Sequence, residues 1–286
     1  MATNTTTGTV PTIQLPAGQP IPVLGQGTWG MGEGKHSQGE EMLAIQLGID
    51  LGLTLIDTAE MYGSGAAEKL IGEAIRGRRK EVFLVSKVLP QNATTYGMVE
   101  ACERSLRRLQ TDYLDMYLLH WRGPVPLENT VDAFGRLGRS GKIRYWGVSN
   151  FDVADMDELM AVPEGYRCQT DQVLYNLSRR GIEYDLLPWC LQRHLVIMAY
   201  SPIEQGRLLK HPALQKVASR HDATPAQVAL AWVLRQKNVN TIPKAATRSH
   251  VMENHAALKL TLTAEDLGEL DRAFPPPTQK VPLEVI

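Results

Sequence analysis

The chain contains 286 residues, of which 43% are hydrophobic, and its 30 lysines and arginines nearly balance its 31 aspartates and glutamates. This size accommodates one large α/β domain or two smaller ones. The balanced charge disfavours a nucleic-acid-binding surface, and there is no run of about 18 apolar residues that would predict a membrane-spanning helix.

Cysteine and histidine usage bears on the compartment and on metal binding. Cys102, Cys168 and Cys190 lie far apart and form neither a CxxC pair nor a disulfide framework. Such usage is typical of a reducing compartment, so we expect a cytoplasmic protein. The seven histidines show no spacing typical of metal ligands, and no metal site is expected.

The N-terminal segment precedes the regular part of the sequence. Its first eight residues, MATNTTTG, are polar and lack the basic start and apolar core of a signal peptide. We therefore predict a flexible tail over 1–8 and a single domain over 9–286. Residues 9–22, TVPTIQLPAGQPIP, alternate apolar and polar residues around Ala17-Gly18 and predict a β-hairpin.

From residue 23 onward, short β-type runs alternate with stretches of helical periodicity. Strands are expected at 23–26, 53–57, 82–87, 112–120, 145–150, 171–176, 195–202 and 239–243. Helices are expected at 40–51, 66–75, 96–109, 127–139, 153–160, 184–193, 212–220, 225–236, 249–258 and 264–273. Eight such units without a linker predict a (β/α)8 TIM barrel, with the hairpin capping its floor and a C-terminal helix and short tail. An open doubly wound sheet stays an alternative, because strand order cannot be read from sequence.

A glycine pattern, Gly25-x-Gly27-x-x-Gly30 in LGQGTWG, resembles the dinucleotide-binding turn of Rossmann folds. That turn needs a helix within the motif and an acid about 20 residues later at the end of a second strand. Here the motif runs into more glycines, and Asp50 falls inside an expected helix. The Rossmann interpretation fails, but Gly27, Thr28 and Trp29 follow the first strand and should emerge at the top of the barrel.

Polar residues follow three consecutive strands at the top face, where reacting groups gather in such barrels. Asp57 directly follows the run LTLI, Lys87 directly follows FLVS, and His120 is the last residue of the next expected strand. Tyr62 lies in the loop after Asp57. Each residue taken singly also has an ordinary structural explanation. Asp57 could cap a turn, Lys87 could be exposed to solvent, and His120 could be a core histidine with its hydrogen bonds made. All four at adjacent strand ends point to one site.

These four residue types suit the reduction of a carbonyl group. A hydride that arrives at the carbonyl carbon leaves negative charge on oxygen, which a tyrosine hydroxyl can protonate. The unperturbed pKa of tyrosine is about 10, and we expect the ammonium of Lys87 to lower it. Asp57 would hold Lys87 in place, and His120 would orient the carbonyl by donating a hydrogen bond.

The motifs DTAEMYGSG, VSK, LLHW, GVSNF, QVLYN, AYSP and IPK occur in this order. Together they resemble the aldo-keto reductase family over about residues 9–275, most closely its bacterial members that reduce methylglyoxal and other small carbonyls. The resemblance implies a (β/α)8 barrel that reduces aldehydes or ketones with NADPH and without a metal. It makes Tyr62 the general acid, tuned by Lys87 and Asp57, with His120 positioning the substrate.

The resemblance also implies a cofactor site. Ser149, Asn150 and Gln172 would bind the nicotinamide carboxamide, Tyr200 would stack on its ring, and Lys244 would meet the 2′-phosphate of NADPH. The other implied cofactor residues are Gly27, Thr28, Trp29 and Asp57 near the nicotinamide; Ser201, Pro202, Ile203, Gln205, Gly206 and Leu208 in a loop over the pyrophosphate; and Ile242, Ala245, His250, Glu253 and Asn254 near the adenosine.

One position departs from the family pattern. His250 stands four residues before Asn254, where many members carry an arginine that pairs with the phosphate. A neutral histidine offers one donor and arginine five, so the preference for NADPH over NADH is expected to be relaxed. Arg248 is close enough in sequence to compensate.

The substrate pocket is expected to be walled by Trp29 and Trp121 and by the loops 88–96 and 122–126, with a short tail at 274–286 leaving it open. We expect a small-molecule carbonyl substrate and a monomer or weak oligomer. Two other functions remain open: a non-enzymatic NADPH-sensing interaction protein similar to channel β-subunits, and a metal-assisted hydrolase that uses Asp57 and His120.

Overall fold

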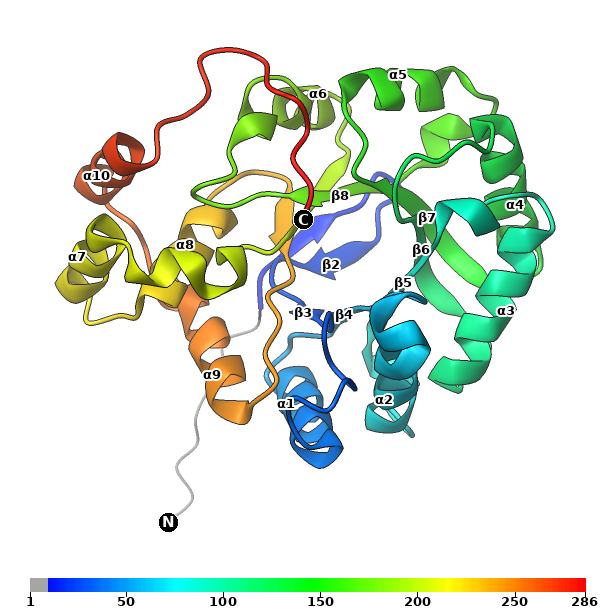
Figure 1. Cartoon of the computed structure of the whole chain (residues 1–286), viewed down its shortest axis with the longest axis horizontal. Coiled ribbons are helices and arrows are strands. Elements are labelled where there is room, and N and C mark those ends of the chain that lie inside the picture. The colour runs from blue at the N-terminus through cyan, green and yellow to red at the C-terminus, as the bar shows by residue number, and fades with distance from the viewer. Residues whose placement is uncertain (1–9) are drawn as a thin grey trace.

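The computed structural model describes residues 10–286 and contains eight parallel strands surrounded by helices (Figure 1). Each strand pairs with the next one along the chain. The strands are β3 (Gln26–Gly27), β4 (Leu55–Asp57), β5 (Phe83–Val88), β6 (Leu114–Leu119), β7 (Ile143–Ser149), β8 (Thr170–Leu174), β9 (Val196–Tyr200) and β10 (Val239–Thr241). The predicted flexible tail over 1–8 lies outside the described residues.

Contacts between the first and last strands close the sheet into a barrel. Leu24 forms a parallel bridge with Thr241, and Gly27 forms one with Lys244. The (β/α)8 prediction is confirmed, and the open doubly wound sheet is wrong, because an open sheet leaves its two edges unpaired. The first strand is shorter than the predicted 23–26, since residues before Gln26 bond to the last strand only through isolated bridges.

Barrel closure explains two glycines of the LGQGTWG motif. A Cβ atom at Gly27 would lie 2.5 Å from the Ile242 carbonyl oxygen, and one at Gly25 would lie 2.8 Å from that of Leu55. Both positions therefore require glycine for backbone approach within the barrel wall. No helix starts within the motif, in agreement with rejection of the Rossmann interpretation.

The helices cover the outside of the barrel close to their predicted positions. They are α1 (Gln38–Asp50), α2 (Ala66–Ala74), α3 (Gly97–Leu109), α4 (Leu127–Arg139), α5 (Val153–Ala161), α6 (Leu186–Gln192), α7 (Pro212–Arg220), α8 (Pro225–Leu234), α9 (Arg248–Ala256) and α10 (Ala264–Ala273). Capping boxes at Ser37, Asp152, Thr224 and Thr263 define four of their starts. No helix in residues 10–286 is long and apolar enough to cross a membrane.

The predicted hairpin closes the floor of the barrel. Its strands β1 (Thr12–Gln14) and β2 (Pro20–Pro22) are antiparallel, with Ile13 opposite Ile21. Leu15 and Ile21 are buried in one cluster with barrel-interior side chains such as Met116 and Met198. The barrel interior beside the hairpin is therefore filled with apolar side chains.

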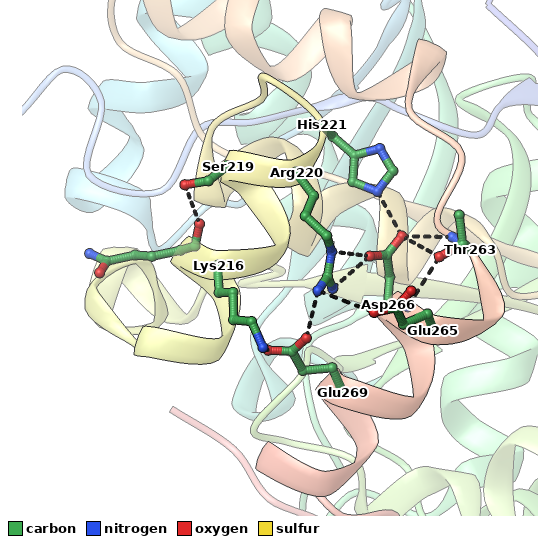
Figure 2. A network of polar contacts seen from close by, with 9 residues as sticks. Lys216, Ser219, Arg220, His221, Thr263, Glu265, Asp266 and Glu269 are labelled. Atoms are coloured by element: carbon green, nitrogen blue, oxygen red, sulfur yellow. Dashed lines mark hydrogen bonds and ion pairs between the residues drawn. The ribbon is translucent and has the colours of Figure 1, made fainter.

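Helices α7 and α10 are joined by a polar network around Asp266 (Figure 2). The buried Asp266 carboxylate accepts from Thr263 at the helix start, from Arg220 and from the ring of His221. Burial opposes its charge, but these hydrogen bonds lower the pKa of Asp266 far below its usual value. The network anchors the helix from which the C-terminal tail departs.

Candidate active site

Four side chains from the upper ends of β4, β5 and β6 and the loop after β4 lie together. The Lys87 ammonium is fully buried and lies 2.7 Å from Asp57 Oδ2, 3.0 Å from the Tyr62 hydroxyl and 3.0 Å from the Thr58 carbonyl oxygen. Three acceptors use the three donors of an ammonium group. The structure thus brings Asp57, Tyr62 and Lys87 into one hydrogen-bonded group, as predicted.

The electrostatics of this group keep Lys87 protonated as an ammonium and Tyr62 protonated as a phenol. Burial alone would lower the pKa of Lys87, but Asp57 and Tyr62 raise it above its usual value, so Lys87 stays an ammonium. Burial of its hydroxyl raises the pKa of Tyr62, and the opposing effect of Lys87 does not outweigh it. Lys87 lowers the pKa of Tyr62, as expected, but burial of the hydroxyl, which the sequence did not indicate, makes the net shift upward.

His120 borders the hydroxyl of Tyr62 from the next strand. The two rings meet edge to face with centroids 5.8 Å apart, and the Trp121 ring lies 5.0 Å from that of His120. Burial and the nearby Lys87 charge lower the pKa of His120 to about 2, so the imidazole is neutral. Its Nδ1 atom is buried and has no hydrogen-bond partner among the described residues, which favours the tautomer with the proton on Nε2.

Two glutamates, Glu68 buried and Glu60 partly buried, hold the loop that carries Tyr62. Glu68, at the start of α2, accepts from Ser86 beside Lys87 (2.7 Å) and from Arg108 on α3. Glu60 accepts from the Leu89 backbone (2.8 Å). Sequence reasoning missed both positioning residues. An acid buried within the first turn of an otherwise apolar helix face was the available signal for Glu68.

A second group of polar side chains adjoins the first. Gln172 donates to Asp57 Oδ1 (2.8 Å), and Ser149 donates to the Gln172 carbonyl oxygen (2.7 Å). Asn150 donates to the His120 carbonyl oxygen (3.1 Å) and accepts from the Tyr200 hydroxyl (2.9 Å). The four residues predicted to surround a nicotinamide thus form one network continuous with Asp57.

The remaining predicted residues surround the rim in different ways. Thr28 is buried and donates to the Asp57 carbonyl oxygen, so it supports the strand end rather than facing outward. Trp29 and Trp121 are 56% and 38% exposed and are free to wall a pocket. In the loop after β9, Pro202 and Leu208 are buried, whereas Gln205 is exposed and Ser201, Ile203 and Gly206 are partly buried.

A basic surface lies at the start of α9. No ion pair within residues 10–286 involves Lys244 or Arg248, and neither cation has a carboxylate partner. His250 is exposed beside them in the first turn, whereas Ile242, Ala245 and Asn254 are buried, and Glu253 is partly buried. Lys244, in the segment before α9, and Arg248, in the first turn of α9, are unneutralised cations of the kind that bind a phosphate group.

A model of the aldo/keto reductase family matches residues 23–274. The chain is 53% identical to methylglyoxal reductase YeaE of Escherichia coli K12, covering 96% of this chain and 98% of that protein. The chain belongs to the aldo/keto reductase family. It is accordingly an NADP-dependent oxidoreductase that acts on aldehydes or ketones, and neither the sensor nor the hydrolase alternative finds support.

Solved structures of other aldo/keto reductases agree with the fold. A Klebsiella pneumoniae enzyme in complex with NADPH superposes with a TM-score of 0.95 at 51% identity, covering 98% of this chain and 100% of that one. A Klebsiella pneumoniae enzyme in complex with NADP and acetate gives a TM-score of 0.94 at 52% identity, covering 96% and 99%. The likeness spans nearly the whole length of this chain and of both solved chains.

Proposed function

We propose that this aldo/keto reductase reduces methylglyoxal and other small carbonyl compounds, with Tyr62 as the general acid. The observation that carries the proposal is the contact of the Tyr62 hydroxyl with a buried ammonium that is itself paired with Asp57. This arrangement keeps the phenol protonated at neutral pH and places a cation beside the oxygen that becomes charged when the proton leaves.

The residues divide the reaction among them. Bound NADPH supplies the hydride. His120, neutral and with its proton on Nε2, donates a hydrogen bond that holds the substrate oxygen near Tyr62. As negative charge develops on that oxygen, Tyr62 transfers its proton to it, and Lys87 stabilises the phenolate that remains. Asp57 fixes Lys87 and balances its charge, and both of these side chains are buried.

We assign the second group of side chains to the cofactor. Ser149, Asn150 and Gln172 offer hydroxyl and amide groups for the carboxamide, and the ring of Tyr200 offers a flat apolar face for the nicotinamide. The loop after β9 would cover the pyrophosphate through Ser201, Pro202, Ile203, Gln205, Gly206 and Leu208. Gly27, Thr28 and Trp29 would flank the nicotinamide from the first strand.

Phosphate selectivity is assigned to the start of α9. Lys244 and Arg248 supply the fixed charge for a 2′-phosphate, and His250 supplies a neutral donor where arginine would add charge. Ile242, Ala245, Glu253 and Asn254 would complete the adenosine end. We infer that NADPH is preferred and that NADH is also accepted.

The assignment of substrate is supported by the relative named methylglyoxal reductase and by an open rim with two exposed tryptophans. We also infer a cytoplasmic monomer or weak oligomer, in line with three buried free cysteines. The deciding assay follows oxidation of NADPH and NADH with methylglyoxal, larger aldehydes, ketones and sugars. Methylglyoxal should give the highest kcat/KM, and turnover of bulky ketones alone would refute the proposed substrate class.

A further inference from the structure

The C-terminal tail, residues 275–286, returns from α10 to the mouth of the barrel. In Figure 1 it leaves α10 at the left, arches over the top and ends near β8 at the centre. The backbone of Ile286 lies close enough to the hydroxyl of Tyr200, whose ring is assigned to the nicotinamide, to oppose the rise in the Tyr200 pKa that burial causes. The end of the chain therefore lies at the proposed cofactor site.

The tail is attached at several points to the loop after β8. Lys280 pairs with Asp185 at 3.2 Å, and Glu284 pairs with Arg179. A Cβ atom at Gly181 would lie 2.7 Å from a Val281 methyl group, so the Val281 side chain packs directly against the Gly181 backbone. These contacts hold the second half of the tail along one loop.

Arg179 links the tail to a second loop, residues 201–208, which we name the cofactor loop. Its Nε and Nη2 atoms lie 3.1 and 3.0 Å from Glu204 Oε1, while its Nη1 atom bonds to Glu284. Glu204 is buried and also accepts from Asn176 (2.8 Å) and Arg207 (2.8 Å). One guanidinium therefore bridges a buried carboxylate in the cofactor loop and a half-exposed one in the tail.

The cofactor loop needs these bonds to keep its shape. The backbone φ angles of Ser201, Glu204 and Gln205 are 50°, 49° and 54°. Residues other than glycine seldom adopt this left-handed region. Asn176 donates to the Ser201 carbonyl oxygen (2.9 Å) and to Glu204, so side-chain bonds hold the strained backbone. Loss of the Arg179–Glu204 contact would release that strain and open the loop.

We propose that Arg179 is a positioning residue that couples the tail to the cofactor loop, and that Glu284 thereby slows the release of NADPH. The inference rests on the proposed placement of the cofactor under residues 201–208. A cofactor held there leaves only when the loop opens. With Glu284 holding Arg179 in place, opening of the loop must break either the Arg179–Glu204 contact or the Arg179–Glu284 ion pair.

The test is the rate at which bound NADPH dissociates, followed by fluorescence in stopped-flow displacement with excess NADP⁺. Glu284→Gln removes the tail's half of the bridge and leaves Arg179 on Glu204. Loss of a partly exposed ion pair should make the dissociation of NADPH roughly two- to five-fold faster. Removing a negative charge near an anionic cofactor would by itself slow release, so the two effects have opposite signs.

Asp185→Asn is the matched control. It removes one carboxylate from the other tail ion pair, keeps a side chain able to cap α6, and contacts neither Arg179 nor Glu204. Its NADPH dissociation rate should equal that of the wild type, with melting temperatures confirming that both variants fold. An unchanged or slower rate in Glu284→Gln, or equal acceleration in both variants, would overturn the coupling. Wild-type protein that fails to bind NADPH would instead overturn the cofactor assignment, and the coupling with it.

Discussion

Neutralising Asp57 should weaken both the fold and the chemistry. In Asp57→Asn, the buried Lys87 loses its only carboxylate partner within residues 10–286, which lies 2.7 Å away. At that distance the attraction between unit charges is roughly 6 kcal/mol for an effective dielectric constant near 20, before desolvation is subtracted. Breaking a buried pair typically costs about 3–5 kcal/mol, and we expect this loss in the free energy of unfolding.

The same substitution should shift the pH dependence of reduction. The Asp57 charge raises the pKa values of both Lys87 and Tyr62, so its removal lowers both. The basic limb of the kcat profile, where Tyr62 loses its proton, should therefore move to lower pH. Steady-state rates between pH 6 and 11 and urea unfolding measure the two effects.

Asp115→Asn is a control for stability alone. Asp115 is equally buried and pairs with Arg79 (2.8 Å) and Arg144 (2.9 Å), but it lies near the start of β6, at the opposite end of the barrel from Tyr62. This variant should also unfold more easily, with the wild-type pH profile intact. An Asp57→Asn profile that matches those of the wild type and Asp115→Asn would refute the reasoning.

Three further variants test separate parts of the structure. Lys87→Met should reduce the single-turnover rate far more than NADPH affinity, and the reverse pattern would place Lys87 in the cofactor site instead. His250→Arg should raise the ratio of kcat/KM for NADPH over NADH by roughly 5–30-fold, in line with a charge-assisted hydrogen bond of about 1–2 kcal/mol, and an unchanged ratio would place the phosphate elsewhere. Asp266→Asn should lower the free energy of unfolding at pH 7 by about 3–5 kcal/mol, the usual cost of breaking a buried ion pair. Because the pKa of Asp266 is lowered by folding, its contribution exists above the usual aspartate pKa and is lost as pH falls. The difference in the free energy of unfolding between Asp266→Asn and the wild type should therefore become smaller at acidic pH. A difference that stays constant with pH would contradict the role given to Asp266.

Sequence periodicity was sufficient to predict the barrel. It also predicted that Asp57, Lys87 and His120 come together, because parallel strands place their carboxyl ends at the same end of the barrel. The role of Gly25 and Gly27 was not accessible, since it depends on contacts with Leu55 and with Ile242, far along the chain. Local motifs predict neighbours along a strand and not partners across the barrel.

The electrostatic details also needed the structure. The net direction of the Tyr62 pKa depends on how deeply its hydroxyl is buried, which no residue type indicates. The bond between Arg179 and Glu284 joins positions 105 residues apart. In the sequence, nothing distinguishes either residue from an ordinary charged surface residue. Charge pairs that hold loops in place are therefore the part of the site that sequence reasoning misses.

The central claim is that Tyr62 delivers the proton, and the rate of a single turnover with bound NADPH and methylglyoxal tests it most directly. Tyr62→Phe keeps the ring and removes the hydroxyl that lies 3.0 Å from Lys87. The rate should fall by roughly 10²–10⁴, the usual contribution of a positioned general acid, with NADPH affinity unchanged. A variant that keeps the wild-type rate at every pH would contradict the assignment.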